Sequence, residues 1–227
     1  MFTRRDFSLA ASAATLAGCA TPGSRADMPA APQATSPLSE AMVGTAVPGM
    51  AAIVIRNFSI ETEYFSGIRA LGSPAMVAPN DRWHQGSNGK AMTATLVAKL
   101  VDAGVLSWER PLAEMLPDLA ATMQPAYRTA TLPDLLSHRA GLPGNVSDMD
   151  FFLTFHTDTA PLRDQRARYI ARCLQEAAAG SARGESSYSN TGFLIAAACA
   201  EQAAGQAFET LIVREVFEPL GIQSISF

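Results

Sequence analysis

The chain of 227 residues is 48% hydrophobic and carries a formal charge of −4, with no long acidic or basic run. This composition is sufficient for one or two globular domains with a sizeable core, and it excludes an intrinsically disordered chain. The weak and evenly spread charge offers no basic surface for nucleic acid or for an anionic membrane. We therefore expect no nucleic-acid partner.

Residues 1–18 have the features of an export signal rather than of a fold element. Arg4 and Arg5 precede an alanine-rich apolar run that is too short for a membrane-spanning helix. The sequence TRRDF resembles a twin-arginine signal, and LAGC, ending at Cys19, resembles a bacterial lipobox. We expect cleavage before Cys19, lipidation of its thiol and a periplasmic protein anchored to a membrane. The alternative is that Cys19 is an ordinary residue of a removed signal.

Residues 19–36 are rich in Pro, Ala, Ser and Gly and predict a flexible tether, so the domain spans residues 37–227. Two β-rich runs, 49–55 and 60–66, predict an antiparallel hairpin joined by residues 56–59. Apolar residues at helical spacing, with capping and stop signals, predict helices at 88–103, 131–136, 163–178, 191–204 and 207–217.

Strands come first and helices follow without regular alternation, which predicts an α+β fold. A two-stranded sheet is marginal by itself. We therefore expect that further strands of the sheet, on its C-terminal side, are missing from this chain or are supplied by something else.

Ser87 and Lys90 form the first pair of residues that could carry chemistry. They lie three positions apart at the start of the predicted helix 88–103, so they share one face of it. A lysine of lowered pKa can take the serine proton, and backbone N–H groups at a helix start can stabilise an oxyanion. The spacing by itself is weakly specific, because a capping serine beside a solvated lysine produces the same pattern.

A second group follows in the polar stretch SSYSNTG, before the helix predicted at 191–204. Tyr188 could transfer a proton near a lysine, and Asn190 could donate to a substrate carbonyl while accepting from that lysine. A packed aromatic and a helix cap are the simpler interpretations of these two residues taken alone.

The two groups gain specificity from the segments around them, which include GSNGKAMTATLVAKLVDAGVLSWERPL, LPDLLSHRAGLPG, YSNTGFLIAAACAEQAAGQAF and FEPLGIQSISF. Their order and spacing resemble serine β-lactamases of class C and related penicillin-binding proteins, D-alanyl-D-alanine peptidases, esterases and amide hydrolases. The resemblance implies a β-lactamase/DD-peptidase-like fold with a helical subdomain and an antiparallel sheet.

The resemblance also assigns roles, with Ser87 as the acylated nucleophile, Lys90 as its base partner, Tyr188 as a second proton-transfer group and Asn190 as a substrate-binding residue. It implies hydrolysis of a small-molecule or peptide substrate, such as a β-lactam, a D-alanyl peptide or a small ester, without a cofactor or a metal.

One family motif has no counterpart here. No Lys-Thr-Gly sequence occurs, and the one His-x-Gly, His84-Gln85-Gly86, lies directly before Ser87 instead of after Asn190, where the family motif is expected. The similarity runs to Phe227, where relatives continue with more strands. We therefore expect the front part of such an enzyme. The alternative function is a non-catalytic or truncated envelope lipoprotein without a complete oxyanion hole.

The remaining polar candidates favour structural roles. His138 lies at a Gly-Pro turn, where packing is favoured over catalysis, and His84 lacks an acidic partner for a Ser-His-Asp triad. Cys173 and Cys199 fall in predicted helices, where buried thiols are favoured over a disulfide, and their spacing indicates no metal site.

Overall fold

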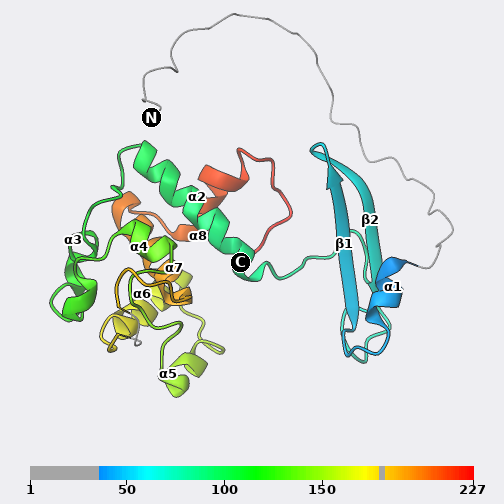
Figure 1. The fold of residues 1–227 in the computed structure, drawn as a ribbon, viewed down its shortest axis with the longest axis horizontal. Helices are drawn as coiled ribbons and strands as arrows, with labels where there is room; N and C mark the ends of the chain where they lie inside the picture. The colour runs from blue at the N-terminus through cyan, green and yellow to red at the C-terminus, as the bar shows by residue number, and fades with distance from the viewer. Residues whose placement is uncertain (1–35, 179–181) are drawn as a thin grey trace, which may run out of the picture. The chain divides into compact units, whose positions relative to one another are not determined.

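The computed structural model describes residues 36–178 and 182–227, which fall into two compact units divided between Asp81 and Arg82 (Figure 1). The predicted export signal, Cys19 and residues 20–35 of the predicted tether lie outside the described residues.

The first unit contains the predicted hairpin. Helix α1 (Pro37–Met42) is followed by strands β1 (Gly49–Arg56) and β2 (Ser59–Gly67), which pair antiparallel from Gly49↔Gly67 to Arg56↔Ser59. The turn residues Asn57 and Phe58 have φ values of 50° and 61°, as the right-handed twist of a two-residue hairpin turn requires. The predicted pair of strands is therefore confirmed, and these two strands are the whole sheet in the described residues.

The second unit is helical, and the order of its elements follows the predicted helices. They are η1 (Gly86–Asn88), α2 (Gly89–Asp102), α3 (Leu112–Met115), η2 (Pro117–Leu119), η3 (Pro125–Tyr127), α4 (Leu132–Leu136), α5 (Met149–Thr154), α6 (Leu162–Cys173), α7 (Asn190–Ala204), α8 (Phe208–Ile212) and the wide turn η4 (Val213–Phe217).

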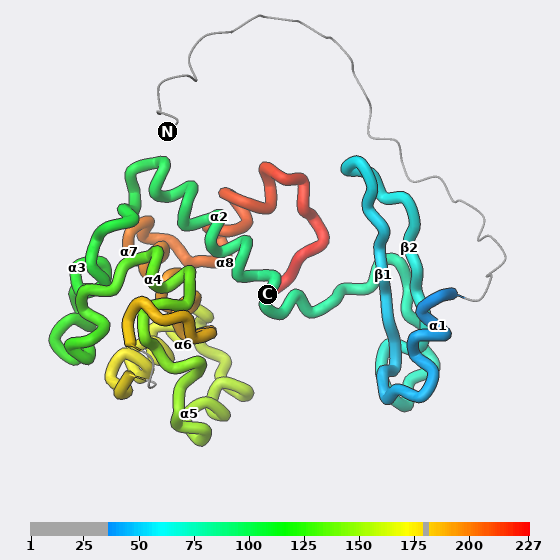
Figure 2. Tube along the Cα trace, in the orientation of Figure 1, coloured from blue at the N-terminus to red at the C-terminus, as the bar shows by residue number. Residues whose placement is uncertain are grey.

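Helix α7 lies at the centre of this unit and packs against α2, α4, α6 and α8 (Figure 2). Its buried face consists largely of small residues, which allows neighbouring helices to approach closely. A Cβ atom added at Gly192 would lie 3.0 Å from the carbonyl oxygen of Leu135, so α4 and α7 are in backbone contact there. This contact brings the start of α7 against the end of α4.

A buried ion-pair network joins three helices on the far side of α7. Arg166 of α6 pairs with Glu201 of α7 and with Glu209 of α8, and the Arg166 side chain is only 9% exposed. The backbone N–H of Phe208 also donates to Glu201, at 2.9 Å. Because both carboxylates are hydrogen-bonded to the one buried guanidinium group, this network fixes the relative positions of α6, α7 and α8.

The end of one predicted helix and the presence of one further helix differ from the sequence prediction. Helix α6 ends at Cys173 instead of residue 178, and the carbonyl of Leu174 accepts from the backbone N–H of Gln124 at 2.8 Å. Helix α5 was not predicted, because its six residues are too few to show a helical period. Its start is fixed by the Asp148 side chain, which accepts from the Phe151 N–H.

Cys173 and Cys199 are both free and buried, which confirms the preference for separate thiols. Across the described ranges, none of the helices combines the length and apolar character needed to cross a bilayer.

Candidate active site

Ser87 occupies the 3₁₀ turn that runs directly into α2. Gly86, immediately before it, has a φ of 52°, a left-handed conformation that glycine adopts without strain. Lys90 follows in the first turn of α2, and its Nζ donates to Ser87 Oγ at 3.2 Å. The predicted proximity of these two side chains is therefore confirmed.

Tyr188 and Asn190 are held on either side of the cap of α7. The hydroxyl of Ser189 accepts from the Gly192 N–H at 3.2 Å and donates to the carbonyl of Pro143 at 2.7 Å. Ser189 is only 3% exposed, so this cap is internal to the fold. The cap fixes the backbone from which the side chains of Tyr188 and Asn190 project.

The four predicted residues lie together, although the two pairs are about 100 positions apart in the chain. Ser87 Oγ and Tyr188 Oη are 2.6 Å apart, and Lys90 Nζ donates to Asn190 Oδ1 at 2.6 Å. Ser87, Lys90, Tyr188 and Asn190 are called the Ser87 cluster below. Its hydrogen bonds form a continuous chain from the phenol through the serine and the lysine to the amide.

The electrostatics of the Ser87 cluster make the Tyr188 phenol more acidic than a free tyrosine. The Lys90 ammonium group, followed by the hydrogen bond with Ser87, lowers the pKa of Tyr188 below the ordinary tyrosine value. Lys90 Nζ also lies 4.7 Å from the centroid of the Tyr188 ring. Because Tyr188 is 54% exposed within its unit, a molecule from solvent can reach it.

Two nearby residues were not predicted as members of the site. Asn145 Oδ1 accepts from Asn190 Nδ2 at 2.9 Å, and the ring of His138 lies 4.5 Å from that of Tyr188. Both come from the segment LSHRAGLPGN, whose glycine and proline signalled only a turn. Within the described residues, the side-chain hydrogen bonds of Ser87 go to Tyr188 and Lys90.

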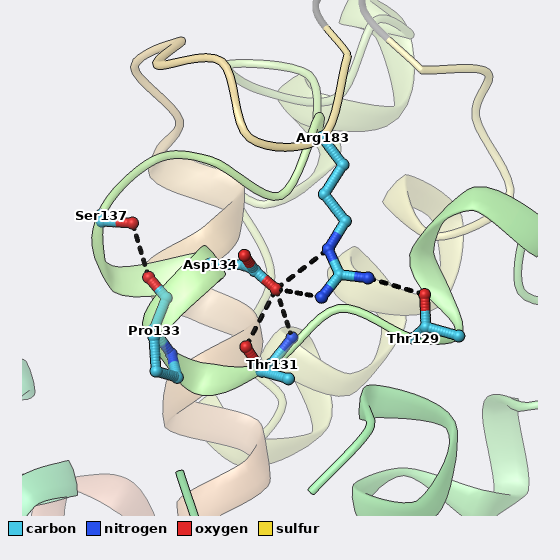
Figure 3. Close-up of polar contacts among 6 residues, drawn as sticks. All are labelled: Thr129, Thr131, Pro133, Asp134, Ser137 and Arg183. Atoms are coloured by element: carbon cyan, nitrogen blue, oxygen red, sulfur yellow. Dashed lines mark hydrogen bonds and ion pairs between the residues drawn. The ribbon is translucent and has the colours of Figure 1, made fainter. Parts of the chain in front are cut away.

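Arg183 ties the segment that carries Tyr188 to the start of α4 (Figure 3). Its guanidinium group donates to Asp134 Oδ2 from Nε at 3.0 Å and from Nη2 at 2.6 Å, and to Thr129 Oγ1 at 2.8 Å. The same Asp134 oxygen accepts from the N–H and the hydroxyl of Thr131, which completes the predicted cap of α4.

Burial raises the pKa of Asp134, but the Thr131 N–H and the Arg183 guanidinium outweigh it, so that the pKa lies below its usual value. The carboxylate is therefore ionised at neutral pH and holds both the cap and the arginine.

No group of three or more His, Cys, Asp or Glu side chains in the described part of the chain is arranged to hold a metal ion. The Ser87 cluster brings together groups that could take part in chemistry. It offers a serine hydroxyl, a phenol oxygen 2.6 Å away and an amide, Asn190 Nδ2, that can donate to a ligand.

A family model described as Beta-lactamase matches residues 36–227. The chain belongs to the beta-lactamase family. Penicillin-binding protein 4 of Amycolatopsis lactamdurans, a relative in this family, is 32% identical over 78% of this chain and 44% of its own length. The fold is the α+β fold of β-lactamases and DD-peptidases, as predicted.

Two further comparisons show how far the similarity extends. The D-alanyl-D-alanine-carboxypeptidase/endopeptidase AmpH of Escherichia coli is 28% identical over 81% of this chain and 46% of that protein. The structure of SurE with D-Leu matches with a TM-score of 0.58 and 30% identity, over 77% of this chain and 36% of that one. The chain thus spans less than half the length of the relatives described here.

Proposed function

We propose that the chain is a serine hydrolase that cleaves an amide or ester through an acyl-enzyme on Ser87. One observation carries this proposal: Ser87 Oγ lies within hydrogen-bonding distance of both Tyr188 Oη and Lys90 Nζ, at 2.6 and 3.2 Å. A serine hydroxyl becomes a nucleophile when a neighbour removes its proton, and the Tyr188 oxygen is placed to do so.

Tyr188 is the better placed proton acceptor. In the hydrogen bonds to Ser87 and Asn190, Lys90 Nζ donates both times, so it is not the acceptor in either. The Tyr188 oxygen, 2.6 Å from Ser87 Oγ, can accept the serine proton when the phenol is ionised. The lowered pKa of Tyr188 makes its phenolate more accessible near neutral pH. Lys90 then stabilises the phenolate and orients Asn190.

The reaction would proceed in two steps, acylation of Ser87 and hydrolysis of the acyl ester. Ser87 Oγ attacks the substrate carbonyl while its proton passes to Tyr188, and backbone N–H groups at the start of α2 stabilise the oxyanion. The tetrahedral intermediate expels the amine or alcohol, which takes the proton from Tyr188. A water molecule, deprotonated by Tyr188, then attacks the acyl ester, the carboxylic acid leaves, and Ser87 regains its proton.

We propose peptides with a D-configured residue at the cleaved bond as the preferred substrates. AmpH is named as a D-alanyl-D-alanine carboxypeptidase, and the SurE structure contains D-leucine. The amide of Asn190, supported by Asn145, could donate its remaining hydrogen to a peptide carbonyl.

Turnover assays test this function. The chain is given a nitrophenyl ester, a penicillin and matched peptides ending in D-Ala-D-Ala or L-Ala-L-Ala. We expect the chain to hydrolyse the ester and the D-peptide, and we expect both turnover rates to fall by at least about a thousandfold in Ser87→Ala. Ser186→Ala, which changes an exposed serine two residues before Tyr188, is the matched control and should retain activity. Equal turnover by the wild type and Ser87→Ala would refute the proposal.

We also propose export through a twin-arginine signal and a lipid anchor on Cys19. Both rest on the sequence, because residues 1–35 lie outside the described range. Metabolic labelling with radioactive palmitate should label the wild type, and Cys19→Ser should be unlabelled and released from the membrane fraction. Replacing Arg4 and Arg5 by lysine should retain the protein in the cytoplasm, and periplasmic delivery of that variant would exclude the twin-arginine route.

A further inference from the structure

His138 follows Ser137, the residue that caps the end of helix α4. The backbone of His138 has a left-handed conformation, with a φ of 61°. This conformation is uncommon for residues other than glycine, and Asn, Asp and His are enriched in it. The role of this residue therefore follows from the contacts of its backbone and its ring.

His138 holds both neighbours of Tyr188. Its carbonyl oxygen accepts from the Ser187 N–H at 2.8 Å, and its ring Nδ1 accepts from the Ser189 N–H at 3.1 Å. One residue thus fixes the backbone on either side of the tyrosine that contacts Ser87.

The same imidazole ring also contacts the tyrosine side chain. The His138 and Tyr188 ring centroids are 4.5 Å apart at an angle of 37°, and the Phe193 ring lies 5.3 Å from His138. Tyr188 is 54% exposed, and its side chain also contacts Ser87 and Lys90. A phenol that rotated away would lose the 2.6 Å contact with Ser87 Oγ.

The Ser189 bond also defines the chemical form of the ring. An Nδ1 that accepts a hydrogen bond carries no hydrogen, so the neutral imidazole has its hydrogen on Nε2. In this form the ring is locked to the cap of α7, and its orientation toward Tyr188 follows from that bond.

We propose that His138 is a positioning residue that holds the Tyr188 phenol against Ser87 through its ring, which Ser189 fixes at Nδ1. This role rests on the proposed function of the Ser87 cluster. His138 does not contact the reacting atoms. It acts through the tyrosine.

Two variants distinguish the effect of the His138 ring from the effect of the hydrogen-bond acceptor that it offers to Ser189. His138→Asn keeps the tolerance for a positive φ and offers an amide oxygen to Ser189, but it removes the ring. His138→Phe keeps a ring and removes the acceptor. Ser137→Ala, at the neighbouring exposed residue, is the control for changes at the end of α4.

The first readout does not require activity. With ¹³C-labelled tyrosine, the Tyr188 signal is assigned from its loss in Tyr188→Phe, and its titration is followed by NMR. Because contact with Lys90 and Ser87 lowers the Tyr188 pKa, loss of position should raise the titration midpoint. We expect a rise in His138→Asn, a smaller rise in His138→Phe and none in Ser137→Ala. An unchanged midpoint in His138→Asn would overturn the proposal, whether or not the chain is active.

The second readout is the rate of Ser87 acylation by the nitrophenyl ester. We expect His138→Asn to slow acylation by about tenfold in the wild-type background and by less than about twofold in Tyr188→Phe, since the effect passes through the tyrosine. Equal loss in both backgrounds would overturn the positioning role. Absence of any acylation in the wild type would instead refute the proposed function, and the titration would still decide the role of His138.

Discussion

At the scale of single residues, the spacing of Ser87 and Lys90 was sufficient to predict their contact, because three positions along a helix determine which side chains meet. Tyr188 and Asn190 required the resemblance to a family, since nothing local relates them to a serine about 100 residues away. Asn145 and the ring of His138 were missed for the same reason. Their contacts are between distant segments, and their own surroundings indicated only a turn.

Lys90 supplies the positive charge of the Ser87 cluster. Because its ammonium group lowers the pKa of Tyr188, Lys90→Met should raise the midpoint of the Tyr188 titration toward the ordinary tyrosine value. The same change should slow acylation by about a hundredfold or more. The ¹³C-tyrosine titration and ester kinetics measure both effects.

The only other lysine supplies the control. Lys99 lies near the end of the same helix and donates to the carbonyl of Glu215 at 2.6 Å, away from the Ser87 cluster. Lys99→Met removes the same charge and should leave the Tyr188 midpoint unchanged. A similar shift in both variants would show that net charge, rather than the Lys90 contact, sets the tyrosine pKa.

At the scale of elements, capping chemistry was the most reliable local signal. The sequence TLPD predicted a capped start for α4, and both bonds of the capping box are present. Helix ends that depend on tertiary contacts were predicted less well. The end of α6 was placed too late, because the Gln124 bond to Leu174 is not visible in the local pattern.

Asp134 combines a helix cap with the anchor for the Tyr188 segment, so its loss should destabilise the fold. Asp134→Asn removes the charge that holds Arg183 and weakens the cap of α4. We expect a loss of about 1–2 kcal/mol in the free energy of unfolding at neutral pH, with most of it from the cap. Urea unfolding measures it, and Asp118→Asn, at an exposed aspartate of η2, is the control.

The difference in unfolding free energy between the wild type and Asp134→Asn should depend on pH in a defined direction. The folded-state pKa of Asp134 lies below its ordinary value, so its carboxylate stabilises the fold above about pH 4. That stabilisation is lost as the pH falls through the lowered folded-state pKa. The gap between the wild type and Asp134→Asn should therefore close in acid, and a gap that persisted would mean that the carboxylate charge is not its source.

At the scale of the whole molecule, the order of strands and helices was sufficient to predict an α+β fold. The helical unit is held together by the buried face of α7, against which α2, α4, α6 and α8 pack. The hairpin alone offers little apolar contact, and Ile53, Ile55 and Ile60 of the hairpin are each more than half exposed. The chain spans less than half the length of each of the two curated relatives reported above.

Burial of the two core thiols makes them reporters of global unfolding. Burial raises the pKa of Cys173 to about 11 and that of Cys199 to about 12. In a Cys19→Ser variant, both thiols should react with a disulfide reagent at least about a thousandfold more slowly than in denaturant. Two thiols per chain should react after unfolding. Rapid reaction of the folded protein, or fewer than two thiols in denaturant, would contradict the buried, unpaired state.

The central claim is that Ser87 becomes acylated with the help of Tyr188 and Lys90. Its most direct measurement is the intact mass of the chain after brief exposure to a fluorescent penicillin or to the nitrophenyl ester, followed by peptide mapping. We predict one adduct on the peptide that contains Ser87, its absence in Ser87→Ala, and much slower formation in Tyr188→Phe than in the control Tyr64→Phe. An adduct that persisted in folded Ser87→Ala, or no adduct in the folded wild type, would contradict the account.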